Sequence, residues 1–224
     1  STAHLRIAEH FLGLTATPLF NVTLHVGTLI VVVFYFRKEV KNILSALAHL
    51  DFKSEHGQLI PLIVVATIPT AIIGLLYVRF LEGTLQAHVF VMFLAIGVAF
   101  LIGATVLFAS RMGKENTNAI TAVTALIMGA AQGLAVFPGL SRSGVTVSTA
   151  LVLGLKREKA FKFSFLLSIP AIFGDLVVET YAQRGQLAQQ TIGPVDLLIG
   201  IIVAMVAGYV AIRLVSNLVR SKRF

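Results

Sequence analysis

The chain has 224 residues, of which 57% are hydrophobic and only 12% are charged, and its mean hydropathy is +0.90. These values lie outside the range of soluble globular domains and indicate a membrane protein. The net charge of +8 is carried by too few residues to form a solvated basic face, which argues against nucleic acid as a partner. The absence of cysteine excludes disulfides, cysteine-ligated zinc, iron–sulfur clusters and a thiol nucleophile.

The amino end begins with Ser1-Thr2-Ala3-His4 and continues into an apolar segment from Leu5 to Leu14. Nothing in it resembles a signal peptide, and we expect a chain trimmed at its amino end. The apolar segment is too short to cross a hydrocarbon core of about 30 Å. It is typical of the exit limb of a re-entrant hairpin whose entry limb is missing.

Five later segments are apolar over about the 20 residues that a membrane span requires. Most of them end at a basic residue, and the fourth contains Pro170, which in a membrane helix predicts a kink rather than a stop. The predicted spans are Phe20–Phe36, Leu59–Val78, His88–Ser110, Phe163–Val178 and Pro194–Ile212.

A different pattern lies between the third and fourth spans. An apolar segment from Asn118 to Phe137 is followed by Pro-Gly-Leu-Ser-Arg-Ser-Gly at 138–144 and by a short apolar run from Val145 to Leu155. Eleven residues cannot cross a membrane as a helix. The pattern therefore predicts a re-entrant helical hairpin with an arginine at its tip.

The distribution of basic residues supports this topology. If the hairpin enters and leaves on one side, segments 37–58, 111–117, 156–162 and 213–224 share that side and hold 14 Lys and Arg residues, against three on the other. The positive-inside rule assigns the basic side to the cytoplasm. Two hairpins entering from opposite faces also indicate an inverted repeat. We therefore predict an all-α polytopic membrane protein with a single membrane domain, in which repeat 1 covers 1–110 and repeat 2, without its last span, covers 111–224.

Arg142 is the most informative residue for function. A guanidinium stays charged and is costly within a membrane unless it faces an anion or a wet cavity, and no acidic residue lies beside it in the sequence. Ser141 and Ser143 flank it, Gly144 allows close backbone approach, and a half-helix begins just beyond. These groups predict an oxyanion cradle suited to phosphate. The alternative is an arginine at the membrane interface in an ordinary loop.

Four polar residues elsewhere are weaker candidates. His4 lies three residues after Ser1, so that on a helical turn the two side chains are neighbours, as a nucleophile and a base need to be. A Ser-x-x-His pair is more often a cap or a surface pair. His25 and Asp175 lie inside predicted spans, where the commonest role of a polar group is a hydrogen bond between helices.

Two motifs and their surroundings resemble one family. The run from Gln132 to Thr146, which contains Phe-Pro-Gly-Leu-Ser-Arg-Ser-Gly, and the run Phe-Ser-Phe-Leu-Leu-Ser-Ile-Pro at 163–170 closely resemble the integral-membrane undecaprenyl-diphosphate phosphatases of the bacitracin-resistance family. Ser1 to His4 resembles the end of that family's first motif, and His25-Val26-Gly27-Thr28 also agrees.

The resemblance implies an enzyme that removes one phosphate from a polyprenyl diphosphate lipid, giving the monophosphate carrier used in peptidoglycan and other cell-wall synthesis. It implies that Arg142 grips the diphosphate, that Thr2, Ser141, Ser143, Gly144 and Thr146 help to bind it, and that Ser1 and His4 belong to the reacting centre. Which of these two attacks phosphorus stays open. A divalent cation, Mg²⁺ or Ca²⁺, is also implied. The metal ligands stay unknown, because two glutamates upstream of the family's Ser-Thr do not occur in this sequence.

The same architecture leaves an alternative open. Broken helices in an inverted repeat are common in transporters, so a polyprenyl-phosphate flippase could use the same cradle without hydrolysis. A structural membrane subunit is a third interpretation, but it leaves Arg142 unexplained. We further expect membrane lipids and a second copy of the chain as partners, in a multi-pass protein of the cytoplasmic membrane whose active site faces the outside or the periplasm.

Overall fold

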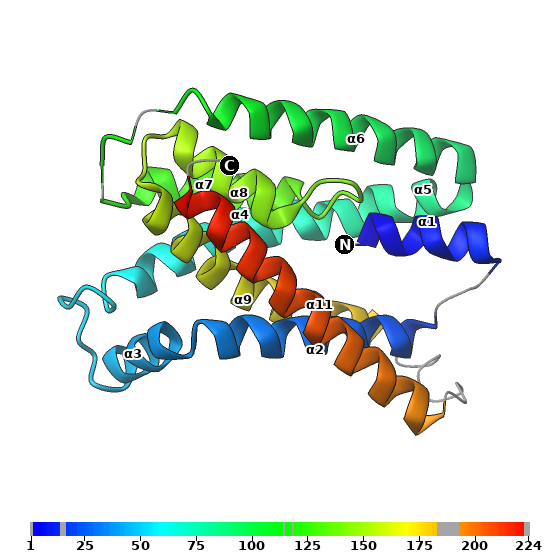
Figure 1. Ribbon diagram of the computed structural model, residues 1–224, viewed down its shortest axis with the longest axis horizontal. Helices are drawn as coiled ribbons and strands as arrows, with labels where there is room; N and C mark the ends of the chain where they lie inside the picture. Colours follow the sequence, from blue (N-terminus) through cyan, green and yellow to red (C-terminus); the bar gives the residue numbers. More distant parts are fainter. Residues whose placement is uncertain (1, 14–16, 114, 118, 183–192, 222–224) are drawn as a thin grey trace.

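The computed structural model describes residues 2–13, 17–113, 115–117, 119–182 and 193–221, and within these ranges it is a bundle of α-helices (Figure 1). Four helices are long and apolar enough to cross a membrane, or five if a bent pair counts as one span. The prediction of an all-α polytopic membrane protein is confirmed. The helices are α1 (Thr2–Leu12), α2 (Pro18–Tyr35), α3 (Arg37–Ala48), α4 (Leu59–Tyr77), α5 (Gly83–Ala87), α6 (Val89–Ser110), α7 (Ala122–Leu134), α8 (Arg142–Val152), α9 (Arg157–Ala182) and α11 (Pro194–Arg220).

The predicted spans coincide with α2, α4, α6, α9 and α11, but several helices are longer than expected. The second span was predicted to end before Arg79, whereas α4 continues through a π-helical turn (Val78–Glu82) into α5. The last helix runs beyond Ile212 to Arg220. A charged residue marks the membrane boundary and does not itself end a helix, since Arg and Lys have good helix propensity.

The segment after the first span is also helical, where the sequence predicted a loop. The chain bends by 82° at Phe36 between α2 and α3. Helix α3 carries basic residues such as Lys38 and Lys41 on one side, and partly buried Val40 and Ile43 on another. It is therefore an amphipathic helix at the end of the bundle rather than a connecting loop.

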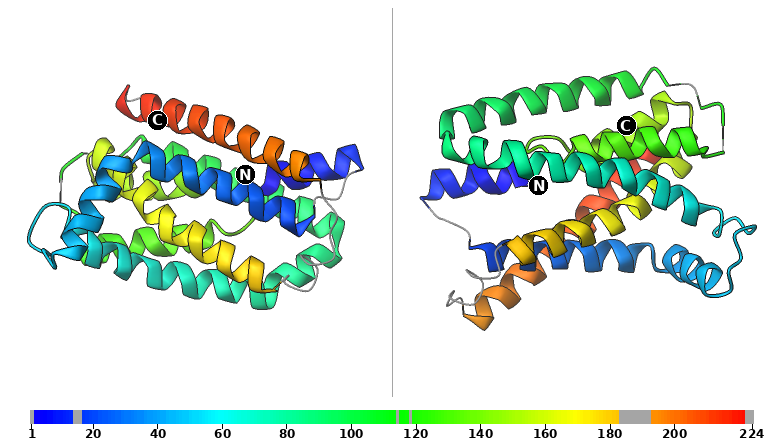
Figure 2. Two further views of the ribbon diagram at one scale, coloured as in Figure 1. Left: turned by 90° about the horizontal axis from the view of Figure 1, so that it is seen from below. Right: turned by 180° about the vertical axis from the view of Figure 1, so that it is seen from behind.

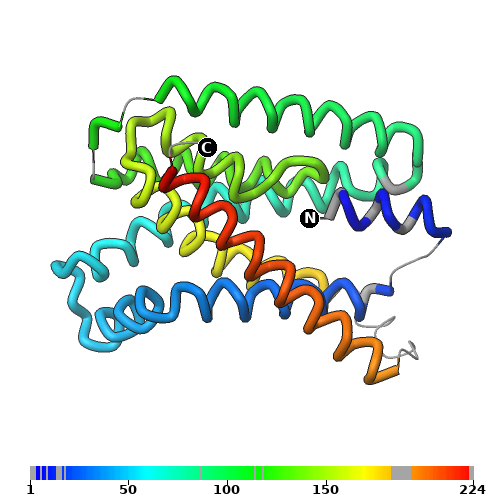
Figure 3. The backbone as a smooth tube through the Cα atoms, viewed as in Figure 1, coloured from blue at the N-terminus to red at the C-terminus, as the bar shows by residue number. Residues whose placement is uncertain are grey.

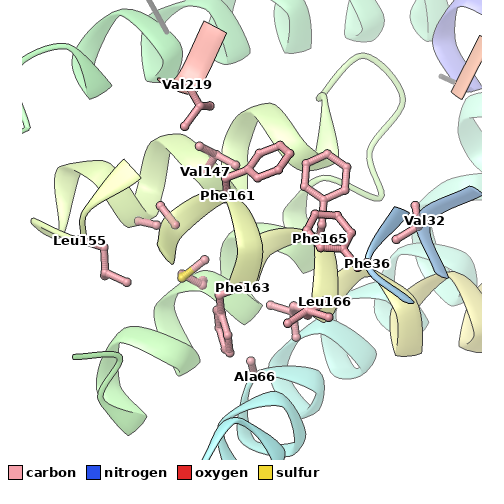
Figure 4. Packing of buried hydrophobic residues seen from close by; sticks show 14 of the residues in the cluster. Val32, Phe36, Ala66, Val147, Leu155, Phe161, Phe163, Phe165, Leu166 and Val219 are labelled. Carbon is pink, nitrogen blue, oxygen red and sulfur yellow. The ribbon is translucent and has the colours of Figure 1, made fainter. Parts of the chain in front are cut away.

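The core surrounds the first half of α9, where the side chains of Phe163, Leu166 and Leu167 are buried. Phe161 and Phe165, whose ring centroids lie 4.7 Å apart, pack against Phe36 at the end of α2 (Figure 4). Helices α4, α8 and α11 contribute Ala66, Val147 and Val219 to the same cluster. Helix α9 is thus central to the bundle, since it packs against α2, α4, α8 and α11.

Helices α4 and α7 approach each other closely because small residues face each other. A Cβ atom at Gly129 would lie 2.0 Å from the carbonyl oxygen of Ala66, so a larger residue does not fit there. The Thr70 hydroxyl lies within hydrogen-bonding distance of the carbonyl oxygens of Ala66 (3.0 Å) and Gly129 (2.8 Å), which share its single proton. Small residues and interhelical hydrogen bonds are the usual means of helix association in membranes.

The predicted hairpin is present as α7 and α8, which pack against each other and are joined by the turn 135–141 (Figures 2 and 3). Its two ends meet, because the N–H groups of Asn116 and Thr117 donate to the carbonyl of Gly154, and that of Lys156 donates to Thr117. Thr117 and Leu155 form a parallel bridge. We call these contacts of residues 116–117 with 154–156 the base clasp. They confirm that the hairpin enters and leaves at one end of the bundle.

Ion pairs tie the remaining basic segments to this end. At the start of α9, Arg157 pairs with Glu115 (3.0 Å) and Lys162 pairs with Glu39 of α3 (3.3 Å). Lys159 also pairs with Glu55, which precedes α4. Three of the four segments predicted to share one side of the membrane, 37–58, 111–117 and 156–162, are therefore at the same end of the protein. The relation of repeat 1 to repeat 2 stays a prediction.

Candidate active site

The turn between α7 and α8 places the candidate anion site. Gly139 has φ +108°, a conformation that side-chain-bearing residues rarely adopt. A Cβ atom there would lie 2.8 Å from both the carbonyl oxygen of Ile96 and the Cβ of Ala99 in α6. Two independent reasons therefore require glycine at this position: the backbone conformation and the close contact with α6. The turn is fixed against α6, and the start of α8 is fixed with it.

Helix α8 begins with a side-chain cap. Ser141, in an extended conformation, accepts a hydrogen bond from the N–H of Gly144 (3.2 Å), and the first intrahelical bond runs from Val145 N–H to the Ser141 carbonyl (2.8 Å). The N–H groups of Arg142 and Ser143 precede that bond, so the helix leaves them available at its positive end. The N–H of Gly144 donates to this cap, and the role of Gly144 in binding the diphosphate stays a prediction. Of the other cradle residues, Arg142 and Ser143 are partly exposed and Ser141 is exposed.

Arg142 has a partner within the protein, although no acidic residue lies beside it in the sequence. Its Nη2 lies 2.5 Å from Oδ2 of Asp175 in α9. The side chains keep 27% and 43% of their surface exposed, respectively. The two residues are 33 positions apart, so their pairing depends on the packing of α8 against α9 and cannot be read from local sequence. Asp175 thus makes the helix-to-helix contact expected of a polar residue within a span.

Thr146 lies in the packed interior of the hairpin, and its assignment as a diphosphate-binding residue stays a prediction. Its side chain is fully buried. The hydroxyl donates to the carbonyl of Arg142 (2.8 Å) and forms a short hydrogen bond with the Ser164 hydroxyl of α9. Thr146 therefore joins the first turn of α8 to α9 from the inside, where it supports the position of Arg142.

A second polar pair lies one helical turn further along α9. The Glu179 carboxylate lies 3.6 Å from Nδ1 of His25 in α2. Asp175 and Glu179 share a face of α9, because residues four apart are neighbours on a helix. Both carboxylates are directed to groups on other helices, Asp175 to a guanidinium and Glu179 to an imidazole. Glu179 was not identified from the sequence, although an acidic residue one turn from Asp175 at the end of a span was a usable signal.

Helix α1 brings His4 to α6, the helix that also contacts the Gly139 turn. The imidazole ring of His4 packs edge-on against Phe100, with ring centroids 5.7 Å apart, and His4 is exposed. The turn that precedes Arg142 contacts the same helix at Ile96 and Ala99. Ser1 lies outside the described residues, and Thr2 is described only as the first residue of α1. The convergence of Ser1 and His4 with Arg142 stays a prediction.

The described residues do not form a protein-only metal site. No group of three or more His, Asp or Glu side chains among them is arranged to hold a metal ion. On α9, the Asp175 carboxylate is engaged by Arg142 and the Glu179 carboxylate faces His25. Mg²⁺ commonly binds through one or two carboxylates and the phosphates of a substrate. The residues described here therefore do not by themselves fit a resident cation, and no catalytic step is assigned to one.

The arrangement can bind a phosphate group. A helix amino terminus with two unengaged N–H groups, a guanidinium and two serine hydroxyls offer several donors to anionic oxygens. Along the axis, α8 extends about 16 Å from Val152, next to the base clasp, to its tip. This is roughly half of a hydrocarbon core of about 30 Å. An anion held at Arg142 would lie deep in the bundle rather than at the basic end.

Comparison with known proteins identifies the family. Residues 1–224, the whole chain, match the family described as Bacitracin resistance protein BacA. The chain belongs to this family. Among curated members, "Undecaprenyl-diphosphatase" of Carboxydothermus hydrogenoformans is 37% identical over 227 residues, covering 98% of this chain and 81% of the relative. The same name is carried by relatives from Treponema denticola (37% identical, 99% of this chain, 82% of the relative) and Korarchaeum cryptofilum (34%, 100% and 84%).

Proposed function

We propose that this membrane protein hydrolyses undecaprenyl diphosphate, releasing inorganic phosphate and leaving the lipid monophosphate. Water is consumed, and the bond that breaks is the phosphoanhydride P–O bond between the two phosphorus atoms. Membership of the bacitracin-resistance family and relatives named undecaprenyl-diphosphatase support this reaction. The observation that carries it is Arg142 at the open amino terminus of α8, inside a bundle too apolar to handle a soluble substrate.

Binding of the diphosphate is assigned to the tip of the hairpin. The Arg142 guanidinium can make two parallel hydrogen bonds to phosphate oxygens, and the serine hydroxyls of Ser141 and Ser143 add further donors. The positive end of α8 favours the same negative charge. These groups also stabilise the charge that develops on the phosphoryl group as the bond breaks, because they are held in place before the substrate arrives.

The reacting centre is proposed to include Ser1 and His4. An imidazole can accept a proton from a serine hydroxyl or from water, and it can itself attack phosphorus. Support for the proposal is that α1 lies along α6, where Phe100 contacts His4 within one helical turn of the residues that hold the Gly139 turn. The diphosphate would be bound from the hairpin side and attacked from the α1 side.

A requirement for Mg²⁺ or Ca²⁺ is proposed from the resemblance alone. When bound with the diphosphate, a divalent cation would offset part of its charge. Phosphate release in the presence of EDTA, followed by addition of either cation, measures the requirement. Undiminished release in EDTA would contradict it.

The site is proposed to open to the outer face of the cytoplasmic membrane. The basic segments lie at one end of the bundle, which the positive-inside rule assigns to the cytoplasm. Thr84 lies in the helical connection between α4 and α6, at the opposite ends of these helices from Ser54. Because the chain has no cysteine, Thr84→Cys should react with a membrane-impermeant thiol reagent in intact cells. Labelling of Ser54→Cys in place of Thr84→Cys would invert the orientation.

A homodimer is proposed as the assembled form, since the helices leave many large apolar side chains on the outside, as lipid or a second copy requires. The mass of the purified protein in detergent, measured by light scattering, tests this. A mass of one chain across the accessible concentration range would contradict it.

The test of the proposed reaction is phosphate release from undecaprenyl diphosphate by the purified protein, with Arg142→Ala as the control. We expect stoichiometric inorganic phosphate and lipid monophosphate from the unaltered protein. Binding of the diphosphate without release of phosphate, together with its transfer between leaflets of a vesicle, would favour the flippase instead.

A further inference from the structure

The contact between Arg142 and Asp175 has an unusual place in the protein. Arg142 is the residue to which the diphosphate is assigned, and its guanidinium is engaged by a carboxylate of another helix at 2.5 Å. A carboxylate presents the same kind of acceptor oxygens as a phosphate. Asp175 therefore occupies part of the position that a phosphate group would take on the arginine.

The exposure of the pair argues against a purely structural role. Arg142 and Asp175 keep 27% and 43% of their side-chain surface open, so the pair is not sealed within the packed helices. The position of α8 against α9 is instead fixed by buried groups, among them the hydrogen bond between Thr146 and Ser164 and the side chain of Val147. The ion pair can open while these helices stay packed.

From this geometry we propose that Asp175 is an internal competitor for Arg142, a role that rests on the proposed function. Asp175 engages the guanidinium when the site is empty and is displaced by the diphosphate. It then returns to the guanidinium as the products leave. Asp175 touches neither the substrate nor the reacting atoms in this scheme, so it is a positioning residue that acts through Arg142.

The charges of substrate and products determine the direction of this exchange. A diphosphate has more anionic oxygens than a single carboxylate, so it can make the bidentate contact that displaces Asp175. Each product carries less charge than the diphosphate from which it came. The same carboxylate therefore competes more successfully against the products than against the substrate, which favours turnover over product inhibition.

Glu179 provides a matched control. It lies one turn further along the same helix and carries the same charge, but it faces His25 rather than Arg142. A general repulsion between acidic residues and the diphosphate would involve both carboxylates. Competition for the guanidinium involves only Asp175.

The experiment measures binding of methylenediphosphonate, a diphosphate analogue with a P–C–P bond, to the purified protein by isothermal titration calorimetry. Asp175→Asn should bind it about fivefold more tightly, the size of effect expected on removal of one partly exposed ion pair. Asp175→Ala, which introduces no amide beside Arg142, should also increase the affinity for the analogue. Glu179→Gln should change this affinity much less. In an Arg142→Ala background, Asp175→Asn should have no effect.

With undecaprenyl diphosphate, Asp175→Asn should lower KM and strengthen inhibition by inorganic phosphate. Unchanged or weaker analogue binding by both Asp175 variants, or no measurable binding by any variant, would overturn the proposal. So would an equal gain in the Arg142→Ala background, because the effect would then not pass through the arginine. Analogue binding does not require hydrolysis, so failure of the unaltered protein to release phosphate would count against the proposed function and leave this comparison standing.

Discussion

The α7–α8 hairpin and helix α1 carry the two groups of candidate residues. The hairpin is packed into the core, whereas α1 lies on the outside. In the hairpin, Thr146 and Val147 are fully buried, and the base clasp joins its two ends. In α1, His4 and His10 are exposed and contact α6 through aromatic rings, and Phe11 has 81% of its surface exposed. The anion site is thus built into the core, whereas the reacting group is carried on its outside.

Because of this difference, substitutions in the hairpin and in α1 are expected to affect different properties of the protein. A change inside the hairpin affects the packing of α8 and α9, so it is expected to alter the free energy of unfolding. A change in α1 removes few buried contacts, so it is expected to alter the reaction alone. Arg142 lies at the border, because its backbone belongs to the buried hairpin and its side chain to the open site. Four substitutions test this division.

Arg142→Ala should have the largest effect on activity. It removes the guanidinium that stabilises charge on the phosphoryl group, and we expect a loss of at least about a hundredfold in phosphate release. Arg142→Lys should be nearly as damaging, because an ammonium cannot form the two parallel hydrogen bonds. Thermal unfolding should stay close to that of the unaltered protein. Arg111→Ala, which removes an exposed arginine at the end of α6, should retain activity, and equal losses in both variants would refute the site.

His4→Ala should come next and should sharpen the comparison from the α1 side. Loss of a group that transfers a proton or attacks phosphorus is expected to reduce kcat about a hundredfold. The unfolding temperature should not change, since His4 is exposed. His10→Ala in the same helix is the control, because His10 packs on Phe93 (4.8 Å between ring centroids) and has no assigned role. A similar loss in the His10 variant would show that α1 as a whole, rather than His4, is needed.

Gly139→Ala should destabilise the protein by about 1–3 kcal/mol, the range for a residue held in a sparsely populated backbone conformation. The new methyl group would also meet Ile96 and Ala99 in α6, so activity should fall as the tip of the hairpin shifts. Gly97→Ala, in α6 itself, has open space at the corresponding position and should be neutral or slightly stabilising. Denaturant unfolding of both variants makes the measurement, and equal stability would contradict the role assigned to the turn.

Thr146→Val should have the smallest effect on the reaction. It leaves the buried Ser164 hydroxyl without its partner, which typically costs about 1–3 kcal/mol. KM for the diphosphate should stay the same, because the Thr146 side chain is fully buried. A raised KM at unchanged stability would instead show that Thr146 takes part in binding the diphosphate.

Much of the fold could be predicted from the sequence because the membrane imposes strong rules. Windows of about 20 apolar residues identify spans, and Pro138 and Gly139 within an apolar region identified the hairpin. Helix α3 was missed because Arg37 and Lys38 were interpreted as the end of a span. The residues after them nevertheless place apolar and polar side chains on different sides of a helix. A helix that bends by 82° at Phe36 cannot be distinguished from a loop by hydropathy.

The site was less predictable because it depends on contacts between distant residues. Arg142 was identified because a charged side chain within a membrane is energetically costly. Its pairing with Asp175 was not predicted, since it depends on how α8 packs against α9. Both residues were noted as charged groups within the membrane, and such groups commonly pair with each other. Thr146 was assigned by resemblance alone, and only its burial against Ser164 revealed a supporting role.

The base clasp also has a consequence for biosynthesis. Helix α7 has 13 residues and α8 has 11, so neither is long enough to be retained as a span when it leaves the ribosome. The clasp joins Thr117 to Leu155, and it can form only after the whole hairpin has been synthesised. We therefore expect α7 and α8 to enter the bilayer together as one unit, after α4 and α6 are in place to receive them. A nascent chain from which Leu155 has not yet emerged from the ribosome should leave α7 accessible to added protease, whereas one from which Lys156 has emerged should protect it.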